Sequence, residues 1–186
     1  MARASASVGT SLKRFAPAWL VPGFALAVAA CGDPAPDSAV AALGPEDAFT
    51  PVGPLHRPGQ PCLLCHKDGG RAKPFTLAGT VYVNATSRSP PLANAEVFML
   101  DAANAIYSAT TNCAGNFFVL PGQFVPSYPV WLTLRAAGAQ RDMDTPTYRE
   151  GSCGACHTAT IGPASPGPVY LLEDPTTQVP PANQCN

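Results

Sequence analysis

Two five-residue segments of the sequence carry the residue types and the spacing needed to attach haem. Both have the form CxxCH, the attachment signature of c-type haem, and they are Cys62–His66 and Cys153–His157. Two thiols add across the two vinyl groups of one porphyrin, and the histidine that follows supplies a neutral imidazole to the iron. Two of the three histidines lie in these motifs, so the sequence predicts two haem c groups. The predicted haem-binding residues are Cys62, Cys65, His66, Cys153, Cys156 and His157.

Candidates for the second axial ligand of each iron are few. His56, the remaining histidine, precedes the first motif and is either a ligand or a solvated side chain. Met143 lies in a polar segment before the second motif and is either a sulfur ligand or a cover for apolar surface. Met99 lies inside a strand-like run, where core packing is expected. A methionine ligand would raise the reduction potential relative to two histidines.

The composition limits the classes of protein to which the chain can belong. Only 12% of its 186 residues are charged, and the formal net charge is -1. The sequence has no basic stripe, so nucleic acid is not expected as a partner. The 22 prolines and 16 glycines disfavour long helices and favour turns and short strands. Few acids or bases converge around the motifs, so we expect an electron carrier with redox-protein partners and not an enzyme.

The N-terminal residues are typical of a bacterial export signal. Basic residues precede an apolar, proline-broken run, as in a secretory signal peptide over residues 1–30. The sequence Val28-Ala-Ala-Cys31 resembles the bacterial lipobox, which implies cleavage before Cys31 and lipidation of its thiol. Such acyl chains anchor a protein to a membrane, and Gly32 favours the outer membrane, facing the periplasm or the cell surface. The alternative is an ordinary signal peptide followed by an unmodified Cys31.

Residues 31–60 are predicted to form a disordered, lipid-anchored tether. Prolines recur there among alanine, glycine and aspartate, and no hydrophobic period appears. Such a segment is expected to be semi-extended. The folded domain is then residues 61–186, with haem-binding loops at 62–66 and 153–157.

The folded region alternates short apolar runs with turn residues. The runs typical of strands are residues 75–83, 96–101, 105–110, 116–120, 130–136 and 169–172. Asparagine, glycine and proline lie between them, as in turns. Short, regularly spaced strands separated by turns favour a mainly β fold, specifically a β-sandwich.

Three segments resemble the carboxypeptidase regulatory-like domain. They are Phe75–Tyr82 with a G-x-V pattern, Leu92–Val97, and Thr111–Phe117 with a T-x-x-x-G-x-F turn. The resemblance covers residues 75 to about 137 and implies a prealbumin-like sandwich, which is a structural or adhesive module. Cys113 departs from the family, where a small or acidic residue is usual. We therefore expect a bacterial lipoprotein in which such a domain carries two haem motifs.

Two of the seven cysteines remain when Cys31 is assigned to lipid and four others to haem. In an oxidising compartment, a leftover pair is expected to form a disulfide. A Cys113–Cys185 disulfide would tie the C-terminal tail to the β domain. The alternative is two separate thiols.

The order of motifs and strands suggests how the haems are arranged. The first motif precedes the first strand and the second follows the fifth, so we expect both outside the core, meeting at one end. The leading hypothesis is a membrane-tethered di-haem cytochrome c that transfers electrons. In one alternative the four motif cysteines bind a tetrahedral zinc ion. In another, each CxxC pair closes as its own disulfide in a structural lipoprotein.

Overall fold

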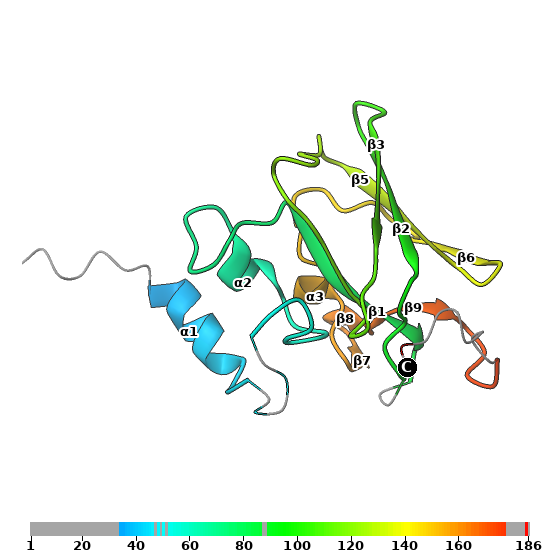
Figure 1. The fold of residues 1–186 in the computed structure, drawn as a ribbon, viewed down its shortest axis with the longest axis horizontal. Coiled ribbons are helices and arrows are strands. Elements are labelled where there is room, and N and C mark those ends of the chain that lie inside the picture. Colours follow the sequence, from blue (N-terminus) through cyan, green and yellow to red (C-terminus); the bar gives the residue numbers. More distant parts are fainter. Residues whose placement is uncertain are drawn as a thin grey trace, which may run out of the picture. The chain divides into compact units, whose positions relative to one another are not determined.

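The computed structural model describes residues 34–46, 48, 50, 52–86, 89–177 and 185 (Figure 1). The expected signal peptide and the lipidation site Cys31 lie outside the described residues. Among the described helices, none has the length and apolar character required to cross a membrane.

The segment expected to be a disordered tether contains regular structure. Helix α1 spans Pro34–Ala42, with Asp37 in its first turn, where a carboxylate interacts favourably with the helix dipole. The helix is followed by Gly44, whose φ of 74° suits a glycine at this place. Asp37 also pairs with Arg71 at 2.5 Å, which joins the helix to the turn after the first motif. The prediction of disorder over residues 31–60 is therefore wrong for the described part of that segment.

The residues between α1 and the first motif are held by asparagine side chains of the β domain. The Asn112 amide donates to the Pro54 carbonyl at 2.7 Å. The Asn116 amide donates to the His56 carbonyl at 3.1 Å. An irregular segment has few backbone partners of its own, so these bonds fix its course towards the first motif.

One sheet has three strands in the order β4-β1-β9. Strand β1 (Leu77–Asn84) pairs antiparallel with β4 (Asn116–Val119) over its first half and parallel with β9 (Val169–Leu172) over its second half. Beside the first half, Ser152 forms a parallel bridge to Ala78. The chain that leads into the second motif therefore occupies the edge of β1.

A second sheet has four antiparallel strands in the order β3-β2-β5-β6. The β5–β6 turn contains Ala137 and Gly138, which both have positive φ, as type I′ hairpins require. A two-stranded ribbon of β7 and β8 follows the second motif. The bounds are β2 Glu96–Asp101, β3 Ile106–Thr110, β5 Val130–Ala136, β6 Ala139–Asp142, β7 Ile161–Gly162 and β8 Ser165–Pro166.

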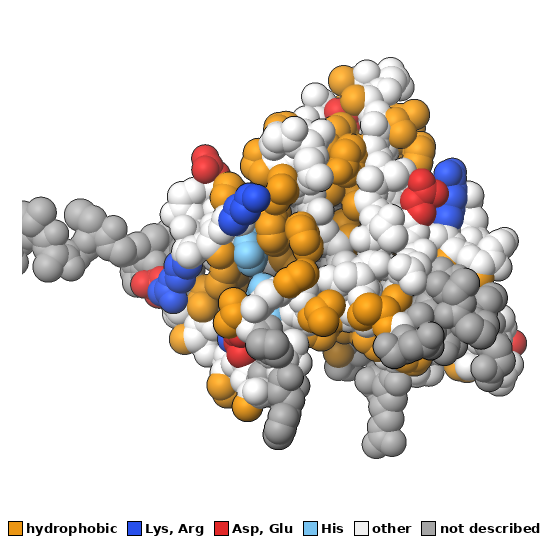
Figure 2. Space-filling view, viewed as in Figure 1, with side chains coloured by type: hydrophobic (Ala, Val, Ile, Leu, Met, Phe, Trp, Pro, Cys, Tyr) orange, Lys and Arg blue, Asp and Glu red, His pale blue; other side chains and the backbone are white. Residues whose placement is uncertain are grey.

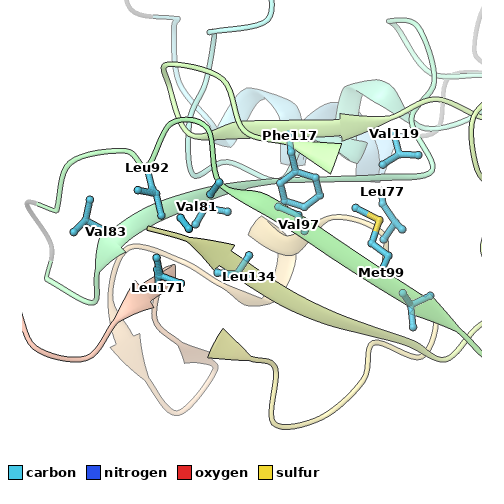
Figure 3. Packing of buried hydrophobic residues seen from close by; sticks show 13 residues of the cluster. Leu77, Val81, Val83, Leu92, Val97, Met99, Phe117, Val119, Leu134 and Leu171 are labelled. Carbon is cyan, nitrogen blue, oxygen red and sulfur yellow. The ribbon is translucent and has the colours of Figure 1, made fainter. Parts of the chain in front are cut away.

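Side chains of the two larger sheets share one hydrophobic core (Figure 3). Among its almost completely inaccessible side chains are Leu77, Val81, Val119, Val97, Met99 and Val130. Strand β2 alternates buried and half-buried residues, whereas β1 is buried on both faces. On the outer face of β1, the Thr80 hydroxyl accepts the Gly59 N–H at 2.7 Å, so the segment before the first motif covers that face.

The chain is mainly β, as the sequence predicts, and all six expected strands are present with ends shifted by at most two residues. Strand β6 does not follow from the sequence pattern. Its residues alternate between half-buried and exposed, and it contains Gln140 and Arg141. The hairpin turn, and not an apolar face, adds this strand to the sheet.

The two motifs, expected in loops, form single helical turns. Helix α2 is Leu63–His66 and helix α3 is Cys153–Cys156. Residues three apart lie on the same side of a helix, so one turn directs both thiols of a CxxC pair the same way. The loop assignment is therefore wrong at these positions, because four residues are too few to show a helical pattern.

Leu77→Ala is expected to lower the free energy of unfolding by about 2–5 kcal/mol, because it leaves a cavity in the core. Leu77 is only 1% exposed. Urea unfolding followed by circular dichroism would measure the loss. The control is Ile106→Ala on β3, at a side chain that is 62% exposed, where a change within about 0.5 kcal/mol is expected. Equal losses in the two variants would contradict the assigned core.

Candidate functional site

The first motif lines a pocket of about 500 Å³, here called the first pocket. Cys62, Cys65 and His66 all contribute to its wall, as do Ala78 and Phe118 from the outer face of the three-stranded sheet. Cofactor and small-molecule sites typically measure roughly 300–1,000 Å³, so the volume suits a large ligand. Figure 2 shows histidine side chains (pale blue) reaching the surface here among apolar and basic side chains.

The imidazole of His66 has one nitrogen fixed by the backbone. Its Nδ1 lies 2.7 Å from the carbonyl oxygen of Lys73. Since a carbonyl only accepts hydrogen bonds, Nδ1 carries the proton and Nε2 is the basic nitrogen. Phe75 stacks on the ring, with the centroids 4.0 Å apart and the planes at 7°. His66 thus presents Nε2 in a fixed orientation, as an axial ligand requires.

His56 lies beside His66 on the wall of the first pocket, with the ring centroids 5.8 Å apart. Its Nδ1 bonds to the Gly53 carbonyl, which leaves Nε2 available. One metal ion bound to two imidazoles, with bonds of about 2.0–2.1 Å, places the two nitrogens about 4 Å apart. The two ring planes are inclined by 30°. The structure therefore places His56 beside His66, and its role as a ligand stays a prediction.

The second motif lines a separate pocket of about 260 Å³, here called the second pocket. Cys153, Cys156 and His157 contribute to its wall, together with the core residues Leu77 and Leu134. The pocket therefore reaches the space between the two larger sheets. Its volume is below the roughly 300–1,000 Å³ of typical cofactor sites, so a group as large as haem would project from it.

His157 repeats the arrangement of His66 with a different backbone partner. Its Nδ1 lies 3.0 Å from the carbonyl oxygen of Gly167, which again leaves Nε2 as the basic nitrogen. Burial lowers the pKa of the His157 imidazole, and the hydrogen bond to Gly167 opposes that shift. The neutral imidazole that burial favours is the form that binds metals.

Met143 lies on the wall of the second pocket, together with His157. It follows β6, and its N–H donates to the Leu132 carbonyl at 3.0 Å, which extends the β5–β6 pairing. Met99, in contrast, is completely buried in the core, as expected. The structure therefore places one distal candidate in each pocket, a histidine in the first and a methionine in the second.

The two motifs lie beside each other at the edge of β1. The Leu63 N–H points to the Ser152 hydroxyl at 3.5 Å, across 89 positions of the sequence. Their pockets lie on opposite sides of the three-stranded sheet, since Ala78 lines the first, Leu77 lines the second, and successive strand residues face opposite ways. The expected meeting of the motifs is confirmed. The expected position outside the core is wrong for the second motif, because Cys153 packs against the core.

The four motif thiols are free. Burial, and next the neighbouring Cys62 thiol, raises the pKa of Cys153 to about 12. Burial also raises the pKa of Cys62. Zinc binds the thiolate, so a zinc ion here would have to displace the protons of these two thiols. Across the part of the chain that the structure describes, no three His, Cys, Asp or Glu side chains gather as a metal site. The four-cysteine zinc cluster therefore lacks its geometry here.

Cys113 and Cys185 form a disulfide, with their Cα atoms 5.4 Å apart. This is the pairing expected from the sequence. It joins a residue near the C-terminal end to the turn before β4.

Removing this disulfide with Cys113→Ser and Cys185→Ser is expected to lower the free energy of unfolding by about 2–4 kcal/mol. The bond closes a loop of 72 residues and restricts the unfolded chain. Urea unfolding of the oxidised protein and of the double variant would measure the difference. Reduction of the wild-type disulfide should reproduce the loss, and unchanged unfolding midpoints would refute the prediction.

Comparisons with known protein families, with curated proteins and with solved structures find no match. The resemblance of residues 75–137 to the carboxypeptidase regulatory-like domain therefore stays a prediction. The site has to be interpreted from its own geometry.

Several residues at the two pockets carry no sequence signal of a role there. Arg57 lines the first pocket and pairs with Glu46 at 3.1 Å. Arg141 lines the second, with its guanidinium 4.0 Å from the centre of the Tyr170 ring. In the sequence, Phe75 has only the pattern of a strand residue. Only the tertiary structure brings these side chains to the motifs.

Proposed function

We propose that this protein is a membrane-tethered di-haem c-type cytochrome that transfers electrons in the periplasm or at the cell surface. The observation that carries the proposal is the repeated local geometry of the two motifs. Each CxxCH turn lines its own pocket, and each histidine is held through Nδ1 so that Nε2 is available. These are the features by which a chain fixes a covalently attached haem and its axial ligand.

The chain's own residues can be assigned to the parts of the cofactor. Bound haem supplies the one-electron chemistry, and the protein supplies ligation, burial and orientation. The thiols of each helical turn would hold the porphyrin, Nε2 of His66 and of His157 would bind the iron, and His56 and Met143 would be the second ligands. Arg57 and Arg141 are cations on the pocket walls, and each is already paired with a carboxylate of the chain, Glu46 and Glu173 respectively.

The two sites would differ in reduction potential. His56 and His66 would hold the first iron, whereas His157 and Met143 would hold the second, and methionine ligation raises the potential. An electron is then favoured on the second site. The protein would accept electrons from one redox protein and pass them to another.

The setting of the two haems belongs to the same proposal. Three-stranded and four-stranded sheets that share one core are compatible with a prealbumin-like β-sandwich. Lipidation of Cys31 would anchor this domain to the outer membrane, with α1 and residues 52–60 between the lipid and the first motif.

The full chain should be expressed with its own signal sequence in a bacterium that has a c-type haem attachment system. We expect two haems per chain, with a Soret band that survives acid–acetone extraction because thioether bonds are covalent. Intact mass gives the stoichiometry, and metal analysis measures zinc in the same sample. A colourless protein with stoichiometric zinc, or with both CxxC pairs oxidised to disulfides, would overturn the proposal in favour of a metal-binding or structural lipoprotein.

A further inference from the structure

Helices α2 and α3 make a reciprocal contact that haem attachment does not itself require. In each motif, the residue after the first cysteine touches the residues that precede the other motif. The Leu63 N–H points to the Ser152 hydroxyl at 3.5 Å, and the Leu63 side chain lies against Gly151. In return, Gly154 lies against the backbone of Gln60.

Gly154 allows this approach because it has no side chain. A Cβ atom at this position would lie 2.6 Å from the Gln60 carbonyl oxygen and 2.9 Å from the Pro61 nitrogen. Both are backbone atoms that cannot rotate away. The first motif has Leu63 at the equivalent position, so a CxxCH turn accepts a side chain there. The glycine therefore serves the contact between the motifs.

A second glycine, Gly79, allows α3 to pack closely against the three-stranded sheet. A Cβ atom at Gly79 of β1 would lie 2.7 Å from Cβ and 2.8 Å from Sγ of Cys153. The first cysteine of each motif, Cys62 or Cys153, adjoins a residue of the contact. One thioether of each haem would therefore be attached next to the place where the motifs touch.

We propose that the α2–α3 contact is the electron path between the two haems and that Gly154 is the positioning residue that keeps this path short. The inference rests on the proposed function. One electron would pass from the haem held by His66 to the haem held by His157, so the first would be oxidised and the second reduced, with no bond made or broken. Because the pockets lie on opposite sides of the three-stranded sheet, an electron accepted on one side is delivered on the other.

The test compares Gly154→Ala with Gly122→Ala in the exported, haem-loaded full chain. An alanine at 154 would force the two helical turns apart, whereas a Cβ at Gly122 meets nothing within 4 Å. Two haems in close contact give a bisignate couplet in the Soret circular dichroism. We expect Gly154→Ala to lose most of this couplet and to slow electron exchange between the haems, with two haems still attached. Gly122→Ala should match the wild type.

Three results would overturn the inference while the proposed function stands. One is a wild-type protein with two haems and no couplet. The second is an equal couplet in the Gly154→Ala and Gly122→Ala proteins. If the Gly154→Ala protein does not accumulate, Ser152→Ala takes its place, because it removes the acceptor of the Leu63 N–H. An unchanged couplet in the Ser152→Ala protein is the third contradicting result. Absence of covalent haem from the wild type would instead refute the proposed function.

Discussion

Replacing Cys62 and Cys65 together by serine is expected to halve the haem content, from two covalently bound haems per chain to one. A serine hydroxyl does not add to a porphyrin vinyl group, whereas the second motif, in its own pocket, keeps both thiols. The mass of the intact chain and the Soret absorbance per chain measure the loss. Replacement of Cys153 and Cys156 should give the same count, with the remaining haem on the first motif.

The matched control for these variants is the Cys113→Ser, Cys185→Ser protein. It also lacks two cysteines, but these form the disulfide and line neither pocket. It should therefore carry two haems in spite of its lower stability. Loss of both haems when one motif is changed, or of none, would contradict two independent attachment sites. Peptide mapping of the remaining haem identifies the motif that carries it.

Exchanging the proposed distal ligands is expected to move the two reduction potentials in opposite directions. His56→Met should raise the potential of the first haem, and Met143→His should lower that of the second, because methionine ligation favours the reduced iron. Each shift should be on the order of 0.1 V, a fraction of the roughly 0.8 V that axial ligands span. Each variant is the control for the other, since only one of the two potentials should change.

A spectroelectrochemical titration resolves the two steps. Met99→Leu serves as a further control, because Met99 is completely buried in the core and an exchange of similar volume is tolerated there. Its two potentials should equal those of the wild type. If Met143→His leaves both potentials unchanged, Met143 is not a ligand, and the same logic applies to His56→Met.

The strands follow from the sequence because their signal is local. Alternation in 96–101 and 130–136 sets which side chains can be buried together, and the turn residues between the runs set where strands end. Strand β6 has no such signal. It is polar, and it is a strand only because the hairpin turn brings it to pair with β5. The disulfide partners follow from the count of cysteines, since they are the two that remain when the others are assigned to lipid and haem. No strand or turn pattern is needed for this prediction.

The segment before the first motif shows where composition misleads. Its prolines and lack of hydrophobic period predict disorder, yet it contains α1 and is held by hydrogen bonds from Asn112 and Asn116. These partners lie 58 and 60 positions away along the sequence. A window of sequence contains no information about such distant donors.

The CxxCH motifs by themselves predict haem attachment, because the two thiols and the histidine are close neighbours along the sequence and need no fold to bring them together. The tertiary structure alone decided how the two sites are placed. Carbonyls of Lys73 and Gly167 select the free imidazole nitrogen, His56 and Met143 enter one pocket each, and the two turns touch through Leu63 and Gly154. These relations join residues that only the pairing of β1 with its neighbours brings together, so they depend on the folded sheet.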